Sequence, residues 1–214
     1  MKDTKYSKRE EIANAITHGI GIVFGIAVLI ILLLFSVRKG DTISITAFSV
    51  YGICLILMYL SSTLYHSFRN VKIKEILRVF DHSSIYLFIA GTYTPVALLA
   101  LEGNLRIGIM VAVWIIAILG VIFKIVTAGK FDRFKALSLI TYIAMGWIAV
   151  FTIKPIVEMT SLNFFFWLLG GGIIYSLGTI FYSIKAIPYN HAIWHLFVLA
   201  GTVLHFVGML LHLA

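Results

Sequence analysis

Long apolar stretches dominate this sequence and restrict what it can fold into. Hydrophobic residues make up 61% of its 214 residues, charged residues make up only 12%, and the mean hydropathy is +1.02. A soluble domain is nearer half apolar and carries about twice that share of charge. A water-soluble fold of this size could not bury so much apolar surface, so the composition predicts a chain that is solvated largely by lipid.

Seven segments are apolar enough to cross a bilayer as helices, which requires about 20 mostly apolar residues each. They cover residues 16–37, 43–66, 81–101, 106–125, 134–153, 163–184 and 190–212. Backbone groups in lipid must be hydrogen-bonded within the segment, and the alternation of barrel strands is lacking, so we expect helices. The predicted fold class is all-α: one seven-helix transmembrane domain over residues 1–214, with residues 1–15 as a cytoplasmic N-terminal segment.

The distribution of Lys and Arg predicts the orientation of these helices. Thirteen of the 17 Lys and Arg residues fall on the side of the N-terminus, and four fall on the other side. Positive charge accumulates on cytoplasmic loops, so we expect a cytoplasmic N-terminus and an external C-terminus in a multi-pass protein of the cell (plasma) membrane. Topology accounts for the net charge of +8, so no nucleic-acid partner is expected. Membrane lipids are the expected partners, and a homo-oligomer remains open.

Histidines within the spans require an explanation, because ionisable residues inside a membrane bundle are costly and usually functional. His191 and His195 are spaced i, i+4 in the last span. They therefore lie on one helix face, which is how a single helix supplies two ligands to one metal ion. The alternative is a helix start with two interfacial histidines bonded to carbonyls or water.

Three further polar residues lie at the ends of neighbouring spans. His66 ends the second span, Ser62 lies one turn deeper on the same face, and Asp81 begins the third span. Taken alone, His66 would favour the negative end of its helix dipole and Asp81 would be an N-cap. The predicted orientation, however, puts His66, Asp81 and the two histidines of the last span at one depth. Three imidazoles with an open fourth position form a catalytic zinc shell, beside which Asp81 could activate water or act as a fourth ligand.

Other residues suggest packing roles. His18, near the start of the first span, could pack against the site or cap its helix. His205 follows His195 by ten residues, about 15 Å along a helix, so we expect it to hydrogen-bond within the bundle rather than share the ion. The glycines at 170–172 and Gly178 should allow close helix packing rather than bind phosphate.

Four motifs carry a resemblance to a known family: NAITHGIG, SSTLYHSF, DHSSIYLFIAGTYTP and HAIWHLFVLAGTVLHFVG. With these motifs and seven spans, the chain resembles the hemolysin III family, a bacterial branch of the progestin and adipoQ receptor superfamily. The resemblance implies a zinc ion held by His66, His191 and His195. Asp81 and Ser62 then match the family's aspartate and serine. The wider superfamily includes alkaline ceramidases.

These observations favour a zinc-dependent hydrolase of a lipid amide or ester, similar to a ceramidase. Zinc would activate water and polarise the carbonyl, Asp81 would transfer the proton, and Ser62 would orient the water or steady the oxyanion. One alternative is a cytolytic, pore-forming protein, although the first, fourth and sixth spans offer almost no polar stripe. The other alternative is a membrane-homeostasis sensor with a structural zinc, which would need a fourth protein ligand.

Overall fold

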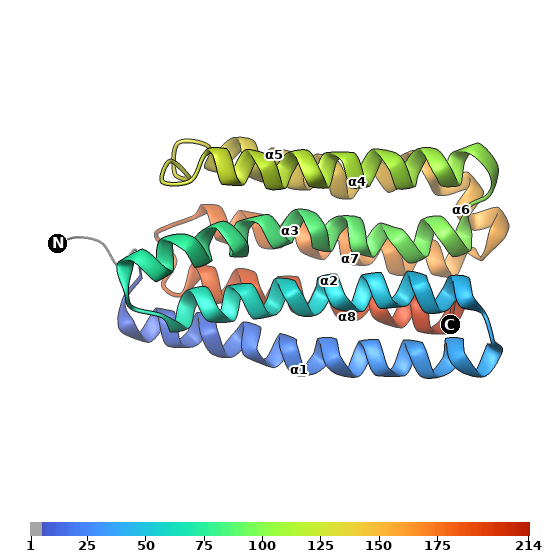
Figure 1. The fold of residues 1–214 in the computed structure, drawn as a ribbon, viewed down its shortest axis with the longest axis horizontal. Coiled ribbons are helices and arrows are strands. Elements are labelled where there is room, and N and C mark those ends of the chain that lie inside the picture. Colours follow the sequence, from blue (N-terminus) through green and yellow to red (C-terminus); the bar gives the residue numbers. More distant parts are fainter. Residues whose placement is uncertain (1–5) are drawn as a thin grey trace.

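The computed structural model describes residues 6–214, and every regular element in that range is helical (Figure 1). Seven helical segments are long and apolar enough to cross a membrane, the fifth of them formed jointly by α5, η1 and α6. The predicted all-α fold with seven spans is therefore confirmed. In order, the elements are α1 (Lys8–Lys39), α2 (Thr42–Ser67), α3 (Val71–Ala100), α4 (Gly103–Val126), α5 (Lys135–Gly146), η1 (Trp147–Thr152), α6 (Ile153–Met159), α7 (Leu162–Ser183) and α8 (Asn190–His212).

The helices run side by side along the long axis of the molecule (Figure 1). Helix α1 packs against α2 and α8, α2 against α3, α3 against α4, and α7 against α8, while α5 approaches α3 and α7. The chain begins at one end of this bundle, here called the N-terminal end, and finishes at the other (Figure 1). Which end faces the cytoplasm stays a prediction from the Lys and Arg distribution.

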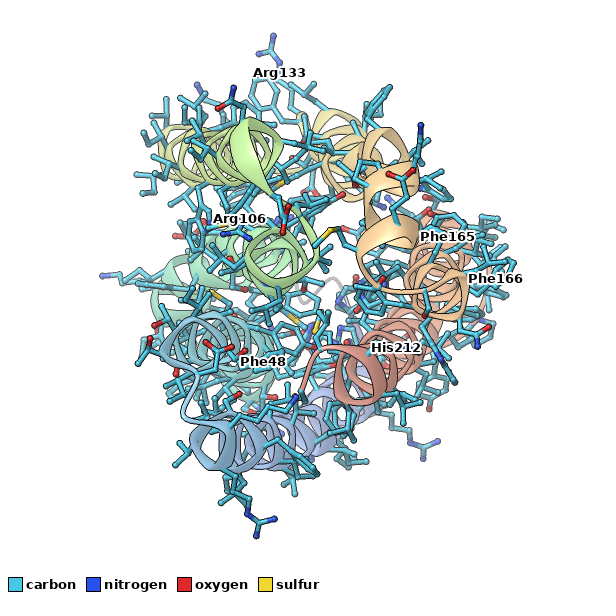
Figure 2. All side chains as sticks on the ribbon, turned by 90° about the vertical axis from the view of Figure 1, so that its right-hand side faces the viewer. Phe48, Arg106, Arg133, Phe165, Phe166 and His212 are labelled. Carbon is cyan, nitrogen blue, oxygen red and sulfur yellow. The ribbon has the colours of Figure 1, made fainter. Side chains whose placement is uncertain are left out.

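The outside of the bundle is apolar. Val23, Val126 and Phe151 are 70%, 77% and 84% exposed, whereas Phe48 is fully buried. Figure 2, which looks along the bundle, shows Phe166 pointing outward from α7 and Phe48 lying between helices. Soluble proteins rarely expose large contiguous apolar patches, so this surface fits lipid rather than water.

Helix α1 begins earlier than the first predicted span. Ser7 caps it in a capping box, in which the Ser7 hydroxyl accepts from the Glu10 amide at 3.3 Å and the Glu10 carboxylate accepts from the Ser7 amide at 2.8 Å. Residues 8–15, which the sequence assigned to an N-terminal segment, therefore add about two turns to α1. These turns carry side chains that reach the candidate metal centre.

Helix α3 also begins earlier than predicted. Its N-cap is Asn70, whose side chain accepts from the amides of Lys72 and Ile73 at 3.0 and 3.3 Å. Residues 71–80, which precede the predicted third span, form the first turns of α3, because a hydropathy boundary marks where a helix leaves lipid and not where the helix begins. Asp81 lies well inside α3, so its interpretation as an N-cap was wrong.

The fifth span is interrupted, contrary to the expectation of one continuous segment over 134–153. Helix α5 stops at Gly146, a 3-10 segment follows, and α6 continues to Met159. At the interruption, the Tyr93 hydroxyl donates to the Gly146 carbonyl at 2.7 Å and accepts from the Ala149 amide at 2.7 Å. Tyr93 thus satisfies backbone groups that a regular helix would have paired, as a lipid environment requires.

Glycines bring α7 and α8 close together. A Cβ atom on Gly171 would lie 2.2 Å from the His205 ring, and one on Gly178 would lie 2.6 Å from Phe197. The packing role expected of the glycines therefore holds at these two positions. It does not hold at Gly172, where an added Cβ would meet nothing within 4 Å.

Candidate metal centre

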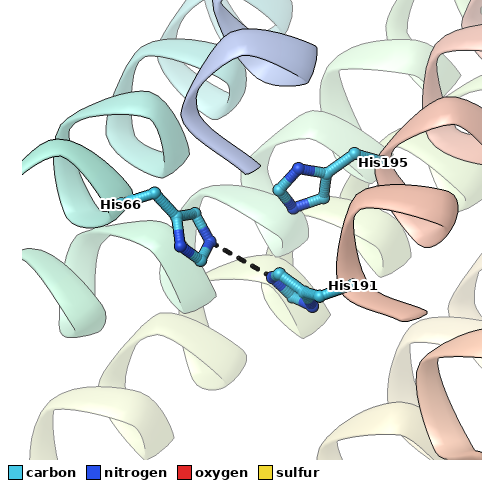
Figure 3. A group of neighbouring side chains, drawn as sticks. All are labelled: His66, His191 and His195. Carbon is cyan, nitrogen blue, oxygen red and sulfur yellow. Dashed lines mark hydrogen bonds between the residues drawn. The ribbon is translucent and has the colours of Figure 1, made fainter. Parts of the chain in front are cut away.

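Three histidine side chains converge at the N-terminal end of the bundle (Figure 3). His66 comes from the last turn of α2, while His191 and His195 come from the start of α8. One nitrogen from each ring lies within 4.8 Å of the other two, and the Nε2 atoms of His66 and His191 are 3.2 Å apart. His66 and His195 are 3% and 1% exposed. The structure thus brings together the three histidines singled out in the sequence.

The spacing of these nitrogens fits a tetrahedral metal ion. Zinc–nitrogen bonds of 2.0–2.1 Å place two ligand nitrogens about 3.3 Å apart. The 3.2 Å separation of His66 and His191 matches that edge, and all three ligand nitrogens lie within 4.8 Å of one another. Within residues 6–214 this is the one group of three His, Cys, Asp or Glu side chains with such spacing.

A carboxylate from α1 orients His66. The Nδ1 atom of His66 lies 2.6 Å from Glu11 Oε2, and the other Glu11 oxygen pairs with the ammonium of Lys74. A carboxylate can only accept here, so Nδ1 carries the proton and the Nε2 atom of His66 presents its lone pair towards His191. Metal-ligating histidines characteristically donate their second nitrogen to such a group.

The same helix orients His195. Its Nδ1 atom lies 3.2 Å from the Asn14 carbonyl oxygen and 3.0 Å from Thr17 Oγ1. The Thr17 hydroxyl donates to the Ala13 carbonyl at 2.9 Å, which leaves its oxygen to accept from His195. Nδ1 is therefore the protonated nitrogen of His195, and Nε2 is available as a ligand.

Sequence reasoning missed these partners on α1. Glu11, Asn14 and Thr17 are spaced by three residues and are followed directly by His18, so they share one helix face. The sequence does contain a sign of these partners, because polar residues recur there at the spacing of one helix face. It was overlooked because residues 8–15 were assigned to a segment outside the spans.

His18 packs against the site, and the alternative that it caps its helix was wrong. Its ring stacks on His195 with centroids 3.4 Å apart and an interplanar angle of 18°, and Tyr59 meets it edge-on at 5.1 Å. The residue is 4% exposed and lines a cavity. Neither ring nitrogen has a hydrogen-bond partner within the described part of the chain, which is costly for a buried imidazole.

Tyr6, just before α1, covers the outer side of the histidines. Its ring stacks on His191 with centroids 5.1 Å apart at 22°. Burial raises the pKa of the Tyr6 phenol, so the phenol stays neutral beside the imidazoles. Tyr182 approaches the same ring at 5.5 Å from α7.

Asp81 and Ser62 lie beside the histidines. Asp81 is 9% and Ser62 is 2% exposed, so both side chains are buried in the bundle. Both line the cavity that His191 and His195 also line. Among the described residues Asp81 is not part of the three-nitrogen group, so it is adjacent to the ligand set rather than within it.

The cavity has a volume of about 200 Å³ and extends from these polar residues into the apolar interior. Its lining comes mainly from α3, α5, α7 and α8, and includes Val96, Leu168 and Val198. His205, further along α8, hydrogen-bonds the Leu168 carbonyl at 3.1 Å, which confirms its expected role in the bundle interior. A polar end joined to an apolar interior suits an amphiphilic molecule.

Comparisons with known proteins cover nearly the whole chain. The family model described as "Haemolysin-III related" matches residues 6–206. "Hemolysin-3" of Bacillus cereus is 46% identical over 204 residues, 95% of this chain and 92% of the relative. "Hemolysin-3 homolog" of Bacillus subtilis (strain 168) is 45% identical over 207 residues, covering 97% and 96%. "Monocyte to macrophage differentiation factor" of Homo sapiens is 31% identical over 209 residues, covering 94% and 83%.

Proposed function

This chain belongs to the haemolysin III family of integral membrane proteins, and we propose that it is a zinc-dependent hydrolase acting on a lipid amide or ester, as a ceramidase does. One observation carries the proposal. Three imidazoles have metal-ligand spacing, and two of them, His191 and His195, line the polar end of a largely apolar cavity that Asp81 and Ser62 also line. Three nitrogen ligands leave a fourth position open, as in catalytic rather than structural zinc sites.

The residues that would hold zinc are His66, His191 and His195, each through one ring nitrogen. When bound, zinc supplies Lewis-acid activation of water and of a carbonyl group. Glu11 and the Asn14 carbonyl fix the rings of His66 and His195, so little reorganisation is needed when the ion binds.

The remaining side chains would carry out the proton chemistry. Asp81 accepts a proton from the attacking water and delivers it to the nitrogen or oxygen of the leaving group. Ser62, beside that carboxylate, orients the water or donates to the developing oxyanion. The apolar walls hold the acyl chain and keep bulk water from the reacting centre.

Lysis is a weaker candidate. The names of the bacterial relatives indicate haemolysis for those proteins. A conducting pore needs a polar path, whereas most of the surface of this cavity is apolar. Membrane damage would therefore arise from cleaved lipid rather than from a channel.

The experiment measures zinc content and lipid cleavage in the same purified protein. We expect about one zinc per chain and hydrolysis of acyl amides or esters, with both lost in His191→Ala. His212→Ala, at the other end of the bundle where His212 lies 3.1 Å from Ser161 Oγ, should change neither. Asp81→Asn should keep zinc and lose cleavage by a factor of about 100 or more.

Two results would contradict the proposal. Zinc-loaded wild-type protein that cleaves no lipid amide or ester would exclude the enzyme while leaving the metal centre. Wild-type protein that binds no zinc would exclude the metal centre itself.

A further inference from the structure

Lys124 is a buried cation at the N-terminal end of the cavity. It lies in the last turn of α4, is 1% exposed, and belongs to the cavity lining. Its ammonium donates to Ser138 Oγ at 2.5 Å. Three aromatic ring centroids surround it at 5.5 to 5.9 Å, those of Phe123, Phe131 and Tyr142.

No carboxylate pairs directly with this ammonium. In the part of the chain that the structure describes, none of the ion pairs within 4.0 Å involves Lys124. Asp81 and Arg78 act on it from further away with opposite signs. Arg78 itself pairs with Asp132 at 3.0 Å, and Asp81 Oδ2 lies 3.9 Å from His82 Nε2.

A buried ammonium without a paired anion is expensive, and within membrane proteins such residues usually face a functional cavity. One hydroxyl and three ring faces offset only part of the cost of desolvation. An apolar side chain of similar length would pack at this position without that cost. A buried ammonium at the polar end of this cavity therefore points to an anionic ligand.

A second ammonium lies at the same end of the cavity. Lys135, half-buried at the start of α5, places Nζ 4.0 Å from the centroid of the Tyr182 ring. Both lysines and Tyr182 line the cavity, whose deeper walls are apolar. Two cations at the polar end of an apolar cavity complement an amphiphile with a negative head and a hydrocarbon chain.

We propose that this cavity binds an acyl lipid with an anionic head group, a carboxylate or a phosphate, held by Lys124 and Lys135. The acyl chain lies along the apolar walls. That this lipid is the substrate rests on the proposed hydrolase function; its amide or ester would then lie between head and chain, beside the histidines. A lipid with a neutral head group, ceramide included, would be a poorer ligand, so the favoured substrate shares the scissile bond of ceramide but not its uncharged head.

The test compares ligands that differ only in charge. Purified protein in neutral detergent is titrated with hexadecyl phosphate, hexadecanoate and uncharged hexadecanol, and binding is followed by native mass spectrometry. We expect the two anions to bind about tenfold or more tightly than the alcohol, as one or two charge-assisted hydrogen bonds allow. Inorganic phosphate, the free-anion probe, should not displace hexadecyl phosphate at equal concentration.

Lys124→Met removes the charge and keeps much of the side-chain length. We expect it to weaken binding of the two anions about tenfold and to leave hexadecanol binding unchanged, which also shows that the variant is folded. Lys130→Met, at an exposed position in the loop after α4, is the matched control and should behave like the wild type. If Lys124→Met does not fold, Lys135→Gln replaces it in the test, and we again expect weaker binding of the two anions and unchanged binding of hexadecanol.

Equal binding of anions and alcohol would overturn the proposal, as would an unchanged preference in folded Lys124→Met. The latter result would make Lys124 a clamp between α4 and α5 through Ser138. Effective displacement by inorganic phosphate would indicate a free-anion site and also overturn it. None of these measurements needs catalysis, so a binding preference without any lipid cleavage would reject only the proposed hydrolase.

Discussion

The Glu11 carboxylate provides the sharpest test of how the histidines are prepared for a metal ion. Glu11→Gln keeps the side-chain shape but removes the charge that accepts the His66 Nδ1 proton across 2.6 Å. The side chains of Glu11 and His66 are 12% and 0% exposed, respectively. The amide can present its NH₂ group to Nδ1, which would move the proton to Nε2 and block the lone pair. Loss of such a partner lowers metal affinity about 10–100-fold, or about 1.4–2.7 kcal/mol. Zinc affinity is measured by competition with a chelator in detergent.

Two further variants separate metal binding from folding. Glu75→Gln changes an exposed carboxylate near the same end of the bundle and should leave zinc affinity unchanged. Lys74→Met breaks the other ion pair of Glu11 but leaves its bond to His66, so we expect less than about threefold weakening. Wild-type zinc affinity in Glu11→Gln would refute the reasoning, because His66 would then be oriented by packing alone.

Two predictions concern the bundle itself. Tyr93→Phe leaves the Gly146 carbonyl and the Ala149 amide without their partner and should lower the free energy of unfolding by about 2–4 kcal/mol, measured by thermal unfolding in detergent. An unchanged melting temperature would show that these groups find other partners. Gly171→Ala should cost about 1–3 kcal/mol, since its Cβ would overlap the ring of His205, whereas the neighbouring Gly172→Ala should be nearly neutral. Equal stability of the two alanine variants would contradict the close packing of α7 on α8.

The seven spans could be predicted because lipid solvation imposes a length and an apolar composition that are written directly in the sequence. The true ends of the helices could not be predicted in this way, because hydropathy does not detect helical turns of polar residues that lie outside the hydrocarbon layer. The early start of α3 depends on the Asn70 cap, and the interruption after Gly146 depends on Tyr93 from a distant helix. The Asn70 cap is a local signal that was missed, whereas the Tyr93 hydrogen bonds are tertiary and leave no local pattern.

The histidine cluster could be predicted from two features: the i, i+4 spacing of His191 and His195 on one helix, and the position of His66 at the same depth on another helix. The orienting residues were not, because Glu11 contacts His66 only when α1 extends beyond its apolar stretch. Lys124, at the end of the predicted span 106–125, was one of the thirteen cationic residues counted toward topology, yet it is buried in the last turn of α4. Whether a lysine side chain is buried depends on how several helices pack around it. The spacing of residues within one segment does not predict that packing.

The most direct measurement is an anomalous difference map from crystals of the intact chain, recorded on both sides of the zinc absorption edge. A single peak about 2.0–2.1 Å from one nitrogen each of His66, His191 and His195 is the predicted result. Zinc-replete crystals with no peak among these three rings, or with the metal bound elsewhere, would contradict the account.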